Sequence, residues 1–304
     1  MPTRTRAPRR RRRNLTPVVF VAPFLLLFLL TFALPIGYAV YQSVMDVEHT
    51  GALGLGGSRT VFVGLSNYAD ALSDHAFVRS IGRVLLFAAV QVPVMVALSA
   101  GLALLLDSAS ARGVRFFRAA FFLPYGVPGV IASILWGFLY VPGVSPLVDG
   151  MSHLGISVDL LGGNTVLWSI ANIVTWEFAG YNVLVLVAQL RTIPSELYEA
   201  ARIDGASAWE TVRHVKLPLL RPALILTTVF TIIGTLQLFA EPLVLKPVSS
   251  SIDSAYTPNL SAYNEAFTND NYHLAAAEAV LLALAAFALS FGFLRLINKR
   301  GGDA

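Results

Sequence analysis

Long apolar runs alternate with shorter polar stretches along most of the chain. A helix needs about 20 mostly apolar residues to cross a hydrocarbon core of about 30 Å, and each long run reaches that length. The pattern therefore predicts six membrane-spanning helices, at residues 18–45, 82–106, 116–141, 165–190, 223–245 and 274–297.

The first apolar run is longer than the stretch of about 7–15 residues found in a signal peptide, and it lacks a small-residue cleavage site. We therefore expect an uncleaved first helix. The other segments are predicted to be a basic arm, an outer loop, a five-helix core that contains a polar loop at 191–222, and a short tail. Their boundaries are 1–17 for the arm, 46–81 for the outer loop, 82–297 for the core and 298–304 for the tail.

Prolines are expected to distort the spans, because proline cannot donate the helical hydrogen bond. Pro23 and Pro35 should bend the first helix near its ends. In the third span, Pro124 and Pro128 free backbone carbonyls on one face, which is tolerable only against protein or water. That arrangement is equally consistent with a simple kink and with a role in a path through the membrane. Pro142 should end this span.

The polar stretch 195–218 separates the fourth and fifth spans and has the residues of two short helices. Ser195 is expected to cap the first helix. Gly205 is expected to end it, because glycine adopts a left-handed conformation without strain. Ser207 and Glu210 have the spacing of a capping box for the second helix. We name residues 195–218 the elbow.

An apolar stripe is expected on the second helix of the elbow. Trp209, Val212 and Val215 recur at intervals that place them on one helical face. A stripe of this kind on a surface helix is typical of a segment that docks into a groove of a partner protein.

The elbow resembles the EAA loop in permease subunits of ABC-type importers. The resemblance rests on Glu199-Ala200-Ala201, Gly205, Val215 and Leu217-Pro218 at the family's spacing, although Ile is usual where this chain has Val215. Other segments are similar to the sugar-importer branch of that family: Ile193-Pro194, Glu196-Leu197-Tyr198, Asp204-Gly205-Ala206, Gly64-Leu65-Ser66-Asn67-Tyr68, and the proline pair of the third span.

The resemblance implies an all-α integral membrane protein with six transmembrane helices and the type I ABC importer permease (MetI-like) fold. The elbow would be the coupling helix that docks on an ATPase, through Glu199, Ala200, Ala201, Asp204, Gly205, Trp209, Leu217 and Pro218. The expected function is ATP-driven, binding-protein-dependent import of a carbohydrate, with a di- or oligosaccharide favoured. Glycerol-3-phosphate or another polar solute is the alternative substrate.

The same resemblance implies several partner chains in a bacterial or archaeal plasma membrane. We expect two copies of a cytoplasmic ABC ATPase, which would bind ATP and Mg, and an extracytoplasmic solute-binding protein. One elbow per chain implies two permease chains in each transporter. A second, related permease is the expected partner, and a homodimer remains an alternative.

The composition supports a membrane protein and excludes several enzyme classes. The chain is 56% hydrophobic and 13% charged, with a mean hydropathy of +0.67, whereas a soluble domain is about one quarter charged. It has no cysteine, so disulfides and thiol catalysis are excluded. No histidine pair has metal-binding spacing. The glycine-rich stretch at 51–58 lacks the lysine of a phosphate loop. We therefore expect no catalytic, metal or cofactor site in this chain.

The distribution of positive charge predicts the orientation. All Lys and Arg residues except Arg59, Arg79, Arg83 and Lys246 fall in the arm, the tail, the loops or the span ends on one side of the membrane. The positive side is cytoplasmic, which places both termini and the elbow inside the cell. This topology also accounts for the basic arm without nucleic-acid binding.

Polar side chains within the spans are the best candidates for a solute path, because polar groups in a membrane are costly. The candidates combine aromatic rings with amide, hydroxyl and carboxyl groups, which suits sugars. These groups can instead link neighbouring helices, at roughly 0.6 kcal/mol each. A secondary, ion-coupled transporter is the alternative class, although no internal repeat is evident. The candidates are Glu177, Tyr181, Asn182, Thr235, Gln237, Phe239 and Glu241.

Overall fold

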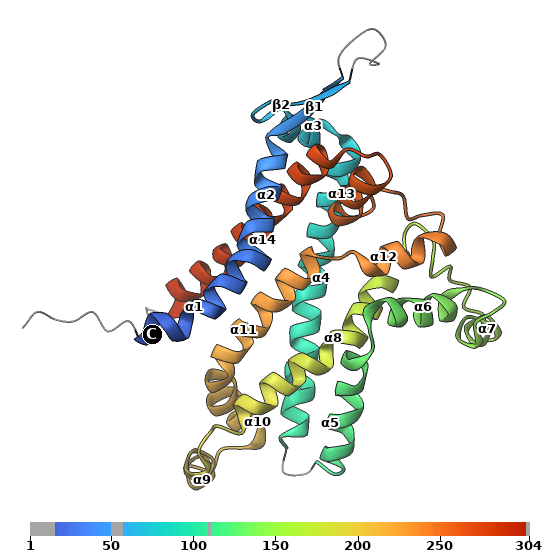
Figure 1. The fold of residues 1–304 in the computed structure, drawn as a ribbon. Coiled ribbons are helices and arrows are strands. Elements are labelled where there is room, and N and C mark those ends of the chain that lie inside the picture. Colours follow the sequence, from blue (N-terminus) through green and yellow to red (C-terminus); the bar gives the residue numbers. More distant parts are fainter. Residues whose placement is uncertain (1–15, 50–56, 109–110, 302–304) are drawn as a thin grey trace, which may run out of the picture.

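The computed structural model describes residues 16–49, 57–108 and 111–301. Nearly all of the predicted basic arm, most of the glycine-rich stretch at 51–58 and the end of the tail lie outside these residues. Helices dominate the part that is described (Figure 1). Their bounds are α1 Thr16–Phe28, α2 Leu34–Ser43, α3 Ser66–Ser73, α4 His75–Leu106, α5 Val114–Phe122, α6 Gly129–Tyr140, α7 Pro146–His153, α8 Val166–Leu190, α9 Ser195–Ile203, α10 Ala208–Thr211, α11 Leu217–Leu236, α12 Ala240–Leu245, α13 Pro258–Phe267 and α14 Tyr272–Gly301.

Within the described residues, five helical segments are long and apolar enough to cross a membrane. A bent pair of helices, Val114–Gly126 and Gly129–Tyr140, makes a sixth if it counts as one span. On that count the predicted number of six is confirmed. The five single segments are Val18–Ser43, His75–Leu106, Val166–Leu190, Ala208–Val248 and Tyr272–Ile297.

The first span joins α1 to α2 through a π-helical stretch at Leu29–Ala33. This irregularity lies between the two prolines that were expected to bend the span, and Pro35 lies two residues after its end. The span packs against α14, and the two run side by side in Figure 1. Most of its large apolar side chains are exposed, as is expected for a surface that faces lipid or another membrane helix.

The segment 46–81, predicted as an outer loop, contains regular structure. Strands β1 (Met45–His49) and β2 (Ser58–Phe62) form an antiparallel hairpin, and α3 follows it. The second span then starts at His75 instead of residue 82, because the side chain of Asp74 accepts hydrogen bonds from the first turn of α4. Asn67 fixes α3 to the end of the first span and to β1 by donating to the Ser43 and Met45 carbonyls.

Helix α4 lies at the centre of the protein and packs against both α8 and α11. Its apolar side chains contribute to two buried clusters. One cluster joins the end of α4 near Leu106 to α8 and the start of α11, around Leu186 and Leu220. The other joins Phe87 of α4 to α6, α8 and α12.

The third span is broken, not merely kinked. Helices α5 and α6 meet at an angle of 100°, and a short 3-10 helix at Leu123–Gly126 separates them. Pro124 and Pro128 both lie in this junction, where neither can supply the hydrogen bonds of a continuous α-helix. Helix α6 ends at Tyr140, just before Pro142, as the sequence predicts.

The fifth span differs from its predicted single helix at 223–245. Helix α11 begins at Leu217, and the α-helical structure stops at Leu236. Residues Gln237, Leu238 and Phe239 are non-helical, and α12 starts at Ala240.

Helices α5 and α8 approach closely at Gly180. A Cβ atom added to this glycine would overlap the backbone carbonyl of Phe121. The absence of a side chain at this position therefore sets the distance between the two helices.

We expect Gly180→Ala to destabilise the protein by at least ~2 kcal/mol, because the added methyl group forces two backbones apart. Thermal unfolding of the purified protein in detergent tests this expectation. Gly101→Ala in α4 is the matched control, since a Cβ atom there meets nothing within 4 Å. Equal melting temperatures for the two variants would contradict the close packing of α5 on α8.

Candidate functional site

The glycine turn of the elbow has the predicted conformation. Gly205 follows α9 with a φ of +76°. The Ala206 amide donates to the Ala201 carbonyl at 2.9 Å, and the Gly205 amide donates to the Arg202 carbonyl at 3.1 Å. These bonds satisfy carbonyls at the helix end in the manner of a Schellman motif. A residue with a side chain would be strained here, because its Cβ atom disfavours positive φ.

The capping box of the second elbow helix is confirmed, and the cap of the first is not. The Ser207 hydroxyl accepts a hydrogen bond from the Glu210 amide, and the Glu210 carboxylate accepts one from the Ser207 amide. Ser195, however, makes no capping bond. Pro194 already has the extended conformation of an N-cap, with φ −59° and ψ 141°, so α9 begins at Ser195 itself.

The second elbow helix does not end within the elbow. Helix α10 continues through a π-helical stretch, Val212–Lys216, into α11. Pro218 is the second residue of α11, where its missing N–H and fixed φ are tolerated. The elbow is therefore one short helix, a glycine turn, and the lower end of the fifth span.

The elbow lies at one end of the protein (Figure 1), and it exposes large apolar side chains. The exposed fractions are 42% for Leu197, 86% for Ile203 and 68% for Trp209. Val212 and Val215 are half-buried, so the predicted stripe is exposed mainly at Trp209. Of the other residues expected to contact an ATPase, Glu199, Ala200, Asp204, Gly205 and Pro218 are exposed, and Ala201 and Leu217 are half-buried.

An ion pair connects the elbow to the transmembrane core. Lys216 donates to the Asp107 carboxylate at 2.7 Å, and the two side chains are only 12% and 23% exposed. The Lys216 ammonium also lies 5.5 Å from the centre of the Tyr198 ring. Burial and the nearby charge of Asp107 raise the pKa of Tyr198. The cluster thus joins the end of α4, helix α9 and the start of α11.

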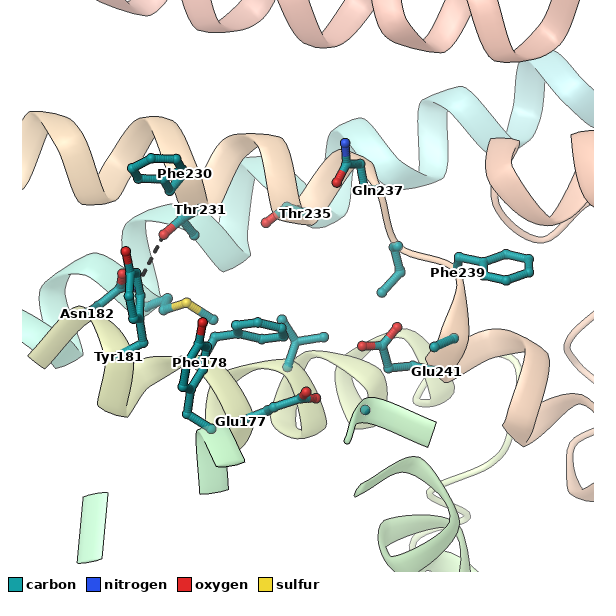
Figure 2. Close-up of a pocket in the computed structure, with 17 residues that line it drawn as sticks. Glu177, Phe178, Tyr181, Asn182, Phe230, Thr231, Thr235, Gln237, Phe239 and Glu241 are labelled. Atoms are coloured by element: carbon teal, nitrogen blue, oxygen red, sulfur yellow. Dashed lines mark hydrogen bonds between the residues drawn. The ribbon is translucent and has the colours of Figure 1, made fainter. Parts of the chain in front are cut away.

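A cavity of about 550 Å³ lies deeper in the protein, between α8 and the α11–α12 junction. Figure 2 shows Phe178, Tyr181 and Asn182 on one wall and Phe230, Thr231 and Thr235 on the other. All seven predicted path residues line this cavity: Glu177, Tyr181, Asn182, Thr235, Gln237, Phe239 and Glu241. Their assignment to a solute path remains a prediction.

Several other lining residues were not predicted from the sequence, including Met95, Tyr125, Phe178, Phe230 and Thr231. Helical spacing could have indicated two of them, because Thr231 and Thr235 are one turn apart, as are Phe178 and Asn182. Met95 and Tyr125 reach the cavity from other helices through tertiary packing, which the pattern of one span cannot show. Asn172, which flanks the predicted candidates in the sequence, instead donates to the Tyr140 hydroxyl at 2.9 Å.

Aromatic rings form one side of the cavity. The Tyr125 and Tyr181 rings stack with their centroids 5.1 Å apart and their planes at 25°. Phe178 meets the Tyr125 ring edge-on at 6.0 Å. Tyr125 lies in the junction between α5 and α6, so the broken third span supplies part of this wall.

Polar groups face the rings. Asn182 donates to the Thr231 hydroxyl at 3.3 Å, which joins α8 to α11 across the cavity (Figure 2). Glu177 and Glu241 are buried, with exposed fractions of 5% and 7%. The Glu177 carboxylate lies against Gly129, the first residue of α6, and its Oε2 atom has no hydrogen-bond partner.

A second, more open groove adjoins the cavity. It lies among α2, α13 and α14, and small residues such as Ala262 and Ala275 form much of its lining. Gln237 and Phe239 line both spaces. The non-helical junction of the fifth span therefore forms a wall shared by the cavity and this groove.

Comparison with protein families identifies the class of protein. Residues 71–301 match the family described as "Binding-protein-dependent transport system inner membrane component". This match covers the elbow, the cavity and five of the spans. The chain therefore belongs to this family of inner-membrane transport components.

Individual relatives cover nearly the full chain. One is the "sn-glycerol-3-phosphate transport system permease protein UgpA" of Agrobacterium fabrum, which is 33% identical over 94% of this chain and 96% of the relative. Another is the "Trehalose transport system permease protein SugA" of Mycobacterium tuberculosis, 28% identical over 94% of this chain and 90% of the relative.

Solved structures confirm the fold. A chain of a bacterial ABC transporter involved in import of "the acidic polysaccharide alginate" matches with a TM-score of 0.79 and 18% identity, over 94% of this chain and 96% of that chain. The same kind of transporter, in complex with a periplasmic protein bound to an alginate pentasaccharide, matches with a TM-score of 0.77 and 19% identity, over 92% and 93% of the two chains. The predicted all-α fold of an ABC importer permease is therefore correct.

We expect Lys216→Met and Asp107→Asn each to lower the free energy of unfolding by about 1–3 kcal/mol, because each leaves a partly buried charge unpaired. The double variant should cost less than the sum of the two single changes. A double-mutant cycle of thermal or denaturant unfolding in detergent measures this difference. Strict additivity would show that the two side chains do not interact.

Proposed function

We propose that this chain is the permease subunit of an ATP-driven importer of carbohydrates, and that its elbow docks on a cytoplasmic ATPase. The observation that carries the proposal is the exposed elbow, with Gly205 at positive φ and Ile203 and Trp209 directed away from the core. Solvated surfaces rarely expose such large apolar groups together without a partner. A secondary transporter would have no need for this feature.

Movement of the elbow would drive the transport cycle. Two ATPases, which bind ATP and Mg, would close together and carry two elbows with them. The spans of two permease chains would then change from an inward-open to an outward-open arrangement. ATP binding must favour one of these two packings for such a change to occur. Both termini and the elbow would be cytoplasmic, as the distribution of positive charge indicates.

A carbohydrate is the solute class that fits the cavity. The stacked Tyr125 and Tyr181 rings offer flat apolar surfaces, while Asn182, Gln237 and Thr235 offer hydrogen-bonding groups nearby. Sugars need both kinds of contact. The names of several relatives refer to trehalose, starch degradation products and diacetylchitobiose.

The functional transporter would contain more than this chain. A solute-binding protein would deliver the sugar from outside, and a second, related permease would complete the path. One of the similar solved structures is a complex with a periplasmic protein that carries an alginate pentasaccharide, which is consistent with this arrangement.

We expect Gly205→Val to abolish uptake without preventing membrane insertion. A β-branched residue at a φ of +76° strains the turn that shapes the elbow. Uptake of a labelled sugar by cells that express the transporter, with the amount of the permease in the membrane measured in parallel, tests this. Gly205→Asn is the matched control, because asparagine tolerates the left-handed conformation and should retain much of the uptake. Normal uptake by a well-inserted valine variant would refute the role of the turn.

Purification of the tagged chain from its native membrane in mild detergent tests the proposed assembly. We expect mass spectrometry to find an ATPase, a second permease and a solute-binding protein, and the solute trapped in the binding protein would identify the substrate. In intact cells, depletion of ATP at a constant membrane potential should stop uptake. Uptake that continues under this condition would favour an ion-coupled transporter.

A further inference from the structure

Two carboxylates are the only charged side chains in the lining of the cavity, as far as the described residues define it. Glu177 comes from α8, and Glu241 comes from the first turn of α12. In Figure 2 the two carboxylates point toward one another across the space. The lining residues include no Lys or Arg that could neutralise them.

The carboxylate of Glu177 is not fully paired within the protein. Glu177 has an exposed fraction of only 5%, yet its Oε2 atom has no hydrogen-bond partner. An unpaired carboxylate oxygen in such a position is costly, and no group of the described residues compensates that cost at Oε2. Glu177 also lies beside Gly129 at the start of α6, where the partial positive charge of a helix N-terminus favours a carboxylate.

We infer that Glu177 and Glu241 make this cavity selective against anions, so that the solute is an uncharged carbohydrate and not a sugar phosphate or a uronic acid. A hydroxyl group can donate a hydrogen bond to either carboxylate, whereas a phosphate or a carboxylate on the solute would be repelled by whichever of the two is ionised. Low-dielectric walls strengthen that repulsion, because apolar side chains such as Phe178 and Phe230 surround the space. This inference deepens the proposed carbohydrate import and rests on the cavity being part of the path.

Anion exclusion would distinguish this chain from some of its relatives. The name of one relative refers to glycerol-3-phosphate, and one transporter of similar structure is involved in the import of an acidic polysaccharide. Both of those solutes are anionic. The two carboxylates predict a different charge preference for this chain, despite the shared fold.

Thiol labelling can measure the charge of the cavity directly, because the chain has no native cysteine. Gly234→Cys is a suitable reporter, since Gly234 lines the cavity and a Cβ atom there meets nothing within 4 Å. The full chain, in membrane vesicles that contain its partners, is treated with two methanethiosulfonates of similar size. One carries a trimethylammonium group, and the other carries a sulfonate group. The fraction of labelled chain over time gives the two rates.

We expect the ratio of the cationic rate to the anionic rate at Gly234→Cys to exceed the ratio for a free thiol in solution by about tenfold or more. Glu177→Gln and Glu241→Gln, which change the shape very little, should each lower this ratio, and together they should bring it close to the solution value. Glu48→Gln is the matched control, because it removes the same charge from the exposed outer hairpin, where Glu48 lies 3.9 Å from Arg59. It should leave the ratio unchanged.

Several results would overturn the inference. A ratio equal to that of the free thiol would show that the carboxylates carry no effective charge toward solutes. A high ratio that survives both glutamine substitutions would assign the effect to other groups. Failure of both reagents to react would show that the space is closed to water-soluble molecules. The measurement needs neither ATP hydrolysis nor a known sugar, so its failure is distinct from failure of the proposed importer function.

Discussion

Hydrocarbon offers no water to pair with backbone N–H and C=O groups, so a break in a membrane helix must face protein or a water-filled space. This constraint governs the protein at two places. The third span breaks at Leu123–Pro128, and the fifth span becomes non-helical at Gln237–Phe239. Both breaks border the same cavity, to which they contribute Tyr125 and Gln237. The cavity is therefore the part of the membrane domain where irregular backbone is tolerable.

Helix α8 has no break of this kind. Because it is regular, it holds fixed positions relative to the helices that pack against it. One of its faces packs closely on α5 through Gly180, and another contributes Leu186 to a buried cluster with α4 and α11. Its remaining face presents Glu177 and Tyr181 to the cavity. A rigid helix with a fixed distance to its neighbours can hold polar groups in place in a membrane, where an unsupported polar group is costly.

Sequence patterns predicted the parts of this protein that depend on composition and helical period. The fourth span matches its predicted bounds almost to the residue, and the glycine turn and capping box of the elbow depend on local chemistry alone. Glu177 and Tyr181 share a face because they are one turn apart, so their joint presence in the cavity was predictable. The break of the third span was signalled by its two prolines, although its 100° angle was not.

Other features depended on tertiary structure and gave no clear signal. Gln237, Leu238 and Phe239 include neither proline nor glycine, and the flanking Gly234 and Pro242 do not by themselves place the end of α11 at Leu236. The helices α3 and α13 are short and polar, and their stability comes from contacts with α4 and α14. The partnership of Lys216 with Asp107 joins positions far apart in the chain, which a single sequence does not reveal.

The continuity of the elbow with the fifth span has a mechanical consequence. From Ala208 to Leu236 the chain is helical without interruption, through the π-helical stretch at Val212–Lys216. At 1.5 Å per residue, such a helix is roughly 40 Å long. A tilt of about 5° at its lower end would displace its upper end by roughly 3–4 Å, on the same helical rise. The helix is thus a lever: a small rotation at the surface becomes a shift as large as an atom's diameter at Thr231, Thr235 and the junction beyond them.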